Sequence, residues 1–276
     1  MCGITGIWDF SKQKSIPQLK SKTKEMADAL SHRGPDGADT WIDPKSHLAL
    51  GHRRLSIIDL SNAASQPMVS SSGRFVITYN GEIYNYRSLR DTLTQSGLTL
   101  KTQSDTEVIL EMCAHFGIEA TLQKLIGMFA FCLWDIVSKK LFLVRDRLGI
   151  KPLYWGMQNN IFAFGSELQS LKPTPHWKFN IDNEAVGGYF LKGYVPAPQS
   201  IYQHIFKLEP GHLLVVDQEK NIRKKAYWSV ENSIQPAKKQ VPTDQLISDF
   251  DTLITDAVQK KIGIRCANWL FSIWWH

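Results

Sequence analysis

The spacing of apolar residues along the first two thirds of the chain predicts both short strands and amphipathic helices. Segments rich in β-branched and aromatic residues predict strands at residues 3–8, 48–58, 75–79, 128–134, 141–145, 153–155 and 161–164. Apolar residues three or four apart predict helices at residues 18–30, 86–96, 105–116 and 182–191. The last four strands follow one another closely, which predicts an antiparallel meander. Because strands and helices come in runs, the order favours α+β over alternating β-α-β units.

Two short motifs refine these boundaries. The dipeptide Asn80-Gly81 is a turn signal, so we expect a turn between the strand at residues 75–79 and the next helix. Ser104 and Glu107 stand three residues apart before an apolar run. This is the spacing of a capping box, and it predicts that a helix begins there.

The C-terminal part of the chain is more polar. Residues 217–250 include a linker by their composition, and residues 244–261 carry apolar side chains at helical spacing. We therefore expect a first domain at residues 2–216 and a separate segment at residues 217–276.

The composition is that of an ordinary globular protein. Of 276 residues, 43% are hydrophobic and 21% are charged. Neither a signal peptide nor an apolar run of about 18 residues occurs, so we expect a cytoplasmic protein without a membrane segment. The net charge of +6 comes partly from lysine pairs in polar stretches without aromatic residues, which argues against nucleic-acid binding.

The four cysteines show no C-x-x-C spacing and no secreted disulfide framework, and we expect no bound metal. Cys113 and Cys132 lie in apolar runs and are expected to be reduced core residues. Cys2 differs because it directly follows Met1, and removal of Met1 would leave a thiol and a free α-amine on one residue. Such an amine titrates near pH 8, so it could accept the proton of the thiol beside it. The alternative is that a cysteine stands at this position by accident.

A thiolate that attacks a carboxamide needs donors for the oxyanion and partners for the charged ends of the substrate. Arg54 has the planar guanidinium that clamps a carboxylate. Asn80 and Gly81 offer an amide side chain and a backbone N–H, and Asp105 could meet an ammonium. Each also has a simpler interpretation: a surface ion pair with Asp59 for the arginine, a plain turn for the Asn-Gly pair, and a helix terminus for the aspartate.

Eight motifs occur in one order along the chain. They are Cys2-Gly3-Ile4, His32-Arg33-Gly34-Pro35-Asp36, His52-Arg53-Arg54-Leu55-Ser56-Ile57-Ile58-Asp59, Gln66-Pro67-Met68, Tyr79-Asn80-Gly81-Glu82-Ile83-Tyr84-Asn85, Ser104-Asp105-Thr106-Glu107, Gly127-Met128-Phe129-Ala130-Phe131 and Arg145-Asp146-Arg147-Leu148-Gly149-Ile150-Lys151-Pro152-Leu153-Tyr154. Together they closely resemble the glutaminase half of glutamine-hydrolysing asparagine synthetase, a class II amidotransferase, over roughly residues 2–230. Class II amidotransferases that act on phosphosugars or purine precursors fit these motifs less well.

The resemblance implies an α+β fold of the N-terminal-nucleophile type, a four-layer αββα sandwich with two antiparallel sheets between helical layers. It implies that Cys2, freed by removal of Met1, attacks the side-chain amide of L-glutamine while its own amine relays the proton. Asn80 and the Gly81 N–H would form the oxyanion hole. A glutamyl thioester would form, ammonia would leave, and water would release glutamate.

The resemblance also implies which residues bind glutamine. Arg54 would hold the α-carboxylate. The α-amino end would meet Glu82, Asp105 and the backbone around Ile57 and Ile58. No cofactor is implied for this half of the family's enzyme.

The family's second half is an α/β ATP-pyrophosphatase domain that uses ATP and Mg²⁺ to amidate L-aspartate. Its Ser-Gly-Gly-x-Asp-Ser phosphate loop does not occur in this chain, so neither ATP nor aspartate is expected to bind here. The chain ends in Trp274-Trp275-His276, and reading these codons one base later would give Gly-Gly. We therefore expect a frameshift near Lys261 and a truncated synthetase domain, of which a weakly ordered first helix remains.

Three interpretations of the function stay open. The first is a glutamine-hydrolysing asparagine synthetase of which this chain keeps the glutaminase. The second is an amidotransferase of the same family that acts on a different acid, such as a sugar acid of a surface polysaccharide. The third is a non-catalytic truncated protein that binds a partner through its C-terminal tryptophans. A homodimer is also left open.

Overall fold

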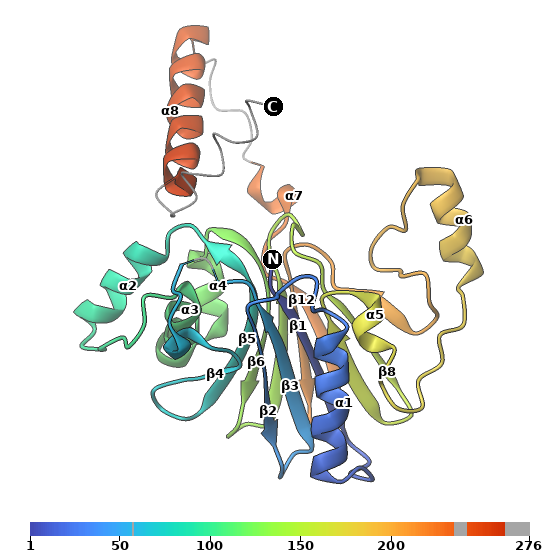
Figure 1. The fold of residues 1–276 in the computed structure, drawn as a ribbon. Helices are drawn as coiled ribbons and strands as arrows, with labels where there is room; N and C mark the ends of the chain where they lie inside the picture. Colours follow the sequence, from blue (N-terminus) through green and yellow to red (C-terminus); the bar gives the residue numbers. More distant parts are fainter. Residues whose placement is uncertain (57, 235–241, 263–276) are drawn as a thin grey trace.

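The computed structural model describes residues 1–56, 58–234 and 242–262, with side chains to residue 259. Figure 1 shows two sheets packed between helices, with the N-terminus at one end of the sheets. Two predictions lie outside the described residues. They are the glutamine contact expected at Ile57 and the frameshifted tail expected at residues 263–276.

The first sheet is antiparallel and holds the N-terminal strand in its interior. It has six strands in the order β10-β8-β9-β1-β3-β2. The strands span Gly3–Asp9 (β1), Gly37–Asp43 (β2), Leu48–Arg54 (β3), Tyr154–Gln158 (β8), Ile161–Gly165 (β9) and Ile205–Lys207 (β10). Gly3 pairs with Arg53, so the chain before β1 meets the chain that leaves β3.

The second sheet is also antiparallel, with six strands in the order β12-β11-β7-β6-β5-β4. The strands span Met68–Val69 (β4), Phe75–Ile83 (β5), Gly127–Asp135 (β6), Lys140–Arg145 (β7), His212–Asp217 (β11) and Ile222–Ala226 (β12). The register of β5 with β6 is unbroken from Phe75, opposite Asp135, to Ile83, opposite Gly127.

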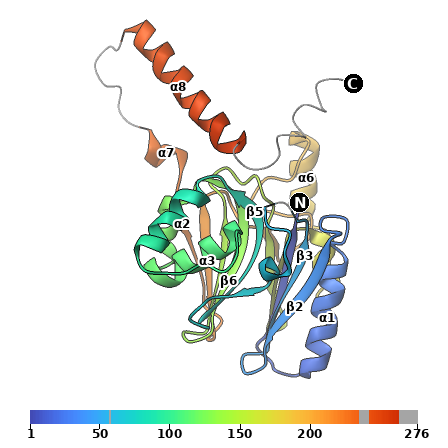
Figure 2. The same ribbon diagram turned by 60° about the vertical axis from the view of Figure 1, so that its left-hand side comes forward.

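Helices cover the outer face of each sheet (Figure 2). The first sheet carries α1 (Ile16–Asp28) and α5 (Leu168–Leu171), and α1 begins with a capping box between Ser15 and Gln18. The second sheet carries α3 (Asp105–Phe116), against which α2 (Tyr86–Gln95) and α4 (Ile118–Lys124) pack. The other described helices are η1 (Asn62–Ala64), α6 (Asn183–Lys192), α7 (Val230–Ser233) and α8 (Thr243–Ile262).

The apolar core fills the three spaces between these four layers. Trp8, Trp134 and Phe164 belong to the cluster between the two sheets, where Trp8 meets Trp134 edge to face at 4.9 Å between ring centroids. Separate clusters lie beneath α1 and beneath the α2–α4 layer. The predicted four-layer α+β sandwich is therefore confirmed. Cys113 and Cys132 are buried and unbridged, as predicted.

The predicted turn at Asn80-Gly81 is wrong. Both residues lie inside β5, where Asn80 pairs with Ala130 and Gly81 with Phe129. A Cβ built on Gly81 would lie 2.3 Å from the Met128 carbonyl oxygen, so glycine is required there by the close approach of β6. Pairing with a long neighbouring strand thus overrides the local turn preference of the Asn-Gly dipeptide.

Three other local predictions need correction. The strand expected at residues 48–58 ends at Arg54. The expected meander is divided between the sheets, because β6 and β7 pair in the second sheet whereas β8 and β9 pair in the first. The capping box is half formed: the Ser104 hydroxyl accepts from Thr106 N, but Glu107 accepts from the backbone N–H groups of residues 101 and 102 instead of that of Ser104.

The helix predicted at residues 244–261 is present as α8. Its apolar side chains are exposed, including Phe250 at 64% and Leu253 at 67%. Among the described residues, none of the helices combines the length and apolarity needed to cross a bilayer.

His52 joins the two sheets from a buried position. It lies in β3 with 1% exposure, and its Nε2 atom lies 3.2 Å from the Tyr79 carbonyl oxygen in β5. Burial lowers the pKa of His52 to about 4, with the contact to Tyr79 opposing this shift. The neutral imidazole therefore donates Nε2–H across the sheets.

The pKa of His52 predicts a loss of stability in acid. In the unfolded chain the imidazole titrates near 6.5, so the unfolded state binds the proton first. The free energy of unfolding should be unaffected by this group above about pH 6.5 and fall by about 3 kcal/mol as the pH drops to about 4. Urea unfolding of wild type and His52→Gln as a function of pH measures this, with the exposed His115→Gln as control. Equal pH slopes in wild type and His52→Gln would show that His52 is not responsible.

Candidate active site

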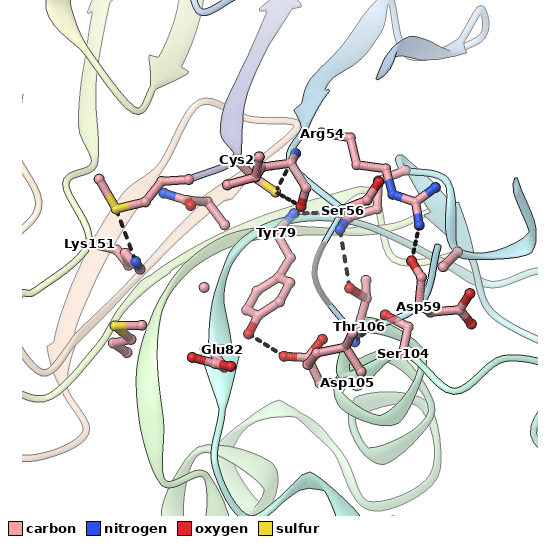
Figure 3. A pocket seen from close by; sticks show the side chains of 18 residues that line it. Cys2, Arg54, Ser56, Asp59, Tyr79, Glu82, Ser104, Asp105, Thr106 and Lys151 are labelled. Carbon is pink, nitrogen blue, oxygen red and sulfur yellow. Dashed lines mark hydrogen bonds between the residues drawn. The ribbon is translucent and has the colours of Figure 1, made fainter. Parts of the chain in front are cut away.

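A cavity of about 130 Å³ opens where the ends of β1 and β3 meet β5 and the start of α3 (Figure 3). Segments from both sheets and from the helical layer contribute to it. Its lining consists of Met1, Cys2, Arg54, Leu55, Ser56, Ile58, Asp59, Ala64, Gln66, Tyr79, Asn80, Gly81, Glu82, Ser104, Asp105, Thr106, Met128 and Lys151. Every predicted site residue within the described ranges is among them.

Nowhere in those ranges do His, Cys, Asp and Glu side chains form a group of three that could hold a metal ion.

The Cys2 thiol lies in this cavity because β1 pairs with β3. Its Sγ atom lies 3.6 Å from the Leu55 carbonyl oxygen and 3.4 Å from Leu55 N, which donates to it. Burial raises the pKa of the Cys2 thiol, and the hydrogen bond with Leu55 opposes this shift. The thiol is therefore mainly protonated near neutral pH and needs a proton acceptor before it can act as a nucleophile.

Arg33 holds the backbone of Cys2 from the loop after α1. Its Nε atom donates to the Cys2 carbonyl oxygen at 3.0 Å, and its guanidinium pairs with Glu167 at 2.6 Å. Although burial acts to raise it, hydrogen bonds from Arg33 and His32 hold the pKa of Glu167 below its usual range. Arg33 belongs to a quoted motif, but sequence reasoning assigned it no role because its partner Glu167 lies 134 residues away.

Asn80 provides a hydrogen-bond donor that the described part of the protein does not satisfy. The residue is 1% exposed, and its Nδ2 atom is buried without a partner among the described residues. Leaving a buried amide unpaired costs about 1–3 kcal/mol, so such a group is expected to have a ligand. Asn80 lines the same cavity as Cys2, and Gly81 follows it in β5.

Asp105 begins α3 and is held by β5. Its Oδ2 atom accepts hydrogen bonds from the Tyr79 hydroxyl at 2.7 Å and from Ile83 N at 3.1 Å. Burial raises the pKa of Asp105, and the hydrogen bond from Tyr79 opposes this shift. The carboxylate thus does more than cap its own helix, because it ties α3 to the strand that carries Asn80.

Arg54 lies at the mouth of the cavity. Its guanidinium donates to the Asp59 carbonyl oxygen and, at 2.9 Å, to the Ser61 carbonyl oxygen. Within the described residues it makes no ion pair with the Asp59 carboxylate, which instead accepts from Ser61 N and Gln103 N. The alternative interpretation, a surface ion pair with Asp59, is therefore not found among the described residues, and main-chain oxygens orient the guanidinium.

Several lining residues were missed by sequence reasoning. Gln66 bridges two elements, because its Oε1 accepts from Tyr79 N at 2.7 Å and its Nε2 donates to the Thr106 hydroxyl at 3.1 Å. Lys151 enters the cavity from the loop after β7. Both belong to motifs that were recognised, but only long-range contacts reveal what their side chains do.

Comparison with known proteins agrees with the family resemblance found in the sequence. Residues 1–228 match the family model described as a glutamine amidotransferase domain. The chain is 37% identical to a putative glutamine-hydrolysing asparagine synthetase 2 of Methanocaldococcus jannaschii, covering 96% of this chain and 52% of that protein. It is 37% identical to glutamine-hydrolysing asparagine synthetase 2 of Bacillus subtilis, covering 94% and 35%. The chain thus spans about half the length, or less, of these two relatives.

The fold also matches a solved structure. The glutamine phosphoribosylpyrophosphate amidotransferase of Bacillus subtilis, complexed with ADP and GMP, aligns with a TM-score of 0.61 and 20% identity. The alignment covers 82% of this chain and 49% of the other. At this identity the match describes the fold alone, and it agrees with the sandwich of two antiparallel sheets.

The raised pKa of Cys2 predicts how its alkylation depends on pH. Because only the thiolate reacts, the rate with iodoacetamide should rise about tenfold per pH unit from pH 7 to pH 9. Peptide mass spectrometry of the native protein measures modification at Cys2, while buried Cys113 and Cys132 serve as internal controls. A rate that levels off below pH 9 would contradict the raised pKa.

Proposed function

Because this chain belongs to the glutamine amidotransferase domain family, we propose that it hydrolyses L-glutamine to glutamate and ammonia at Cys2. The observation that carries the proposal is the buried, unpartnered Nδ2 atom of Asn80 in the cavity that also holds the Cys2 thiol. A nucleophile beside an unsatisfied hydrogen-bond donor is the arrangement that acyl transfer requires.

Asn80 and Gly81 supply the oxyanion hole in this proposal. When the thiolate adds to the side-chain carbonyl of glutamine, negative charge develops on the carbonyl oxygen. The Asn80 amide and the Gly81 N–H then donate to that oxygen. Both groups lie in a strand paired along its whole length with β6, so they need little reorganisation when the charge develops.

The charged ends of glutamine meet the opposite walls of the cavity. The Arg54 guanidinium binds the α-carboxylate, and its planar fork suits two parallel hydrogen bonds. Glu82 and Asp105 bind the α-amino end of glutamine in this proposal, together with the backbone around Ile57 and Ile58. Asp105 is already fixed by Tyr79, which makes it an oriented acceptor.

The reaction proceeds in two steps. Removal of Met1 gives Cys2 a free α-amine, which takes the thiol proton as sulfur attacks the amide carbon. The proton passes to the leaving nitrogen, the C–N bond breaks, and ammonia leaves a glutamyl thioester. Water then adds to the thioester, the C–S bond breaks, and glutamate and the Cys2 thiol are released. A cytoplasmic location, where the thiol stays reduced, belongs to the same proposal.

For the whole protein we propose glutamine-hydrolysing asparagine synthesis, because the two relatives described above carry that name. In this proposal the glutaminase, predicted at residues 2–216, also includes β12 of the second sheet, and the rest of residues 217–276 forms a linker and the start of a synthetase domain. ATP, Mg²⁺ and L-aspartate are used by the synthetase domain, and the glutaminase half needs no cofactor.

Substitution of Asn80 tests the oxyanion hole. Asn80→Ala should lower kcat for ammonia release by about 10²–10³ while KM changes only a few-fold, because the lost hydrogen bond forms mainly in the transition state. The assay uses protein whose Met1 has been removed, as checked by intact mass. Cys2→Ala gives the background rate, and Asn232→Ala, at an exposed asparagine, is the matched control.

The assay separates the oxyanion role from a general loss of folding. Thermal unfolding of each variant checks that the sandwich is intact. If Asn80→Ala retains more than a tenth of the wild-type kcat, its amide is not an oxyanion donor. If Cys2→Ala releases ammonia as fast as wild type, Cys2 is not the nucleophile.

A further inference from the structure

Lys151 carries a charge that the fold buries without a strong partner. The residue is 4% exposed and lines the same cavity as Cys2. Its Nζ atom lies 3.2 Å from the Met1 sulfur, the contact drawn from Lys151 in Figure 3. A thioether is a weak acceptor, and the described residues offer this ammonium no other hydrogen bond. Burial of a poorly paired cation is costly, so its position calls for a functional explanation.

The loop that carries Lys151 is held rigidly by Asp146. The Oδ1 atom of this buried carboxylate accepts from Leu148 N at 3.1 Å and from Ile150 N at 2.9 Å. Its Oδ2 atom accepts from Lys151 N at 2.9 Å and from Phe129 N in β6 at 3.1 Å. Four backbone donors on one carboxylate fix the loop against the second sheet.

Arg145 holds the same loop from its other side. The guanidinium donates to the carbonyl oxygens of Gly149, Lys151 and Leu208 at 2.7, 2.8 and 2.6 Å. Gly149 has a φ of +68°, which lets the chain turn back toward the cavity. The backbone of Lys151 is therefore bonded through both its N–H and its carbonyl. These two hydrogen bonds fix the backbone from which the Lys151 side chain enters the cavity.

We propose that Lys151 is a positioning residue whose positive charge, held in the same cavity, keeps the α-amine of trimmed Cys2 neutral. This rests on the proposed function, in which that amine accepts the thiol proton. Removal of Met1 removes the sulfur that Lys151 contacts. The new α-amine then belongs to Cys2, the residue that followed Met1. A nearby cation lowers the pKa of an amine, so the amine stays unprotonated and able to act as a base at a lower pH.

Both positive and negative groups act on the N-terminal α-amine, and Lys151 is one of the positive groups. Burial lowers the pKa of the Met1 α-amine; the Cys2 thiol opposes this shift, and Arg33 and Lys151 add to it. Arg33 is already paired with Glu167, and Asp36, which favours protonation, accepts from Ser56 N at 2.8 Å. The charged and titratable groups that bear on the amine or on Lys151 are Arg33, Asp36, Glu82, Asp146 and the Cys2 thiol.

The pH profile of Lys151→Met tests the proposal. Loss of the cation should raise the pKa of the Cys2 amine and move the acidic limb of kcat/KM upward by about one pH unit. Activity at pH 6.5 should then fall about tenfold, while activity above pH 8.5 should stay within about twofold of wild type. Lys151→Arg keeps the charge and should keep the limb in place. Lys172→Met, at an exposed lysine, is the matched control.

A second measurement does not depend on glutaminase activity. In a Cys2→Ala background with Met1 removed, the rate of acetylation by acetic anhydride against pH gives the pKa of the N-terminal amine. This pKa should rise by about one unit with Lys151→Met and return with Lys151→Arg. An unchanged amine pKa, or a loss of kcat/KM by one factor at every pH, would overturn the proposal. An inactive wild type with a shifted amine pKa would instead overturn the glutaminase alone.

Discussion

The antiparallel pairing of β1 with β3 is the constraint on which the site depends. Gly3 lies opposite Arg53, so the Cys2 thiol before β1 and the Arg54 guanidinium at the last residue of β3 lie at the same end of the sheet. β1 is buried on both faces, with Ile4 and Trp8 between the two sheets and Ile7 beneath α1. A shift of one residue would exchange these faces and place the wrong side chains in each cluster, so packing fixes the register. The position of Cys2 relative to Leu55 and Arg54 is thus a consequence of core packing.

The second sheet brings the remaining groups to the same end. The unbroken pairing of β5 with β6 carries Asn80 and Gly81 to the cavity, and Gly81 allows β6 to come close. Tyr79, next to them, ties the strand to α3 through Asp105. Because His52 connects β3 to β5, the two halves of the site are joined by the same contact that links the sheets. The contacts of His52 and Tyr79 therefore both hold the cavity lining in place and connect the layers of the fold.

The layered α+β fold was predicted from the sequence. The predicted site residues that the structure describes line one cavity, because motifs record which residues gather even when they are far apart in the chain. Local patterns were less reliable. The Asn80-Gly81 turn was wrong because a neighbouring strand determines the conformation there, and the meander was wrong because spacing does not record that β8 and β9 join the other sheet. The roles of Gln66, Arg33 and Lys151 depend on partners that no local pattern contains.

The central claim is that Cys2 is a nucleophile in a site shaped for glutamine. Covalent labelling tests it most directly, using a glutamine analogue in which a chloromethyl ketone replaces the carboxamide. We expect a single adduct, located at Cys2 by peptide mass spectrometry, that forms in step with loss of ammonia release and is suppressed by L-glutamine. Labelling at another residue, or labelling of Cys2 that glutamine does not slow, would contradict it.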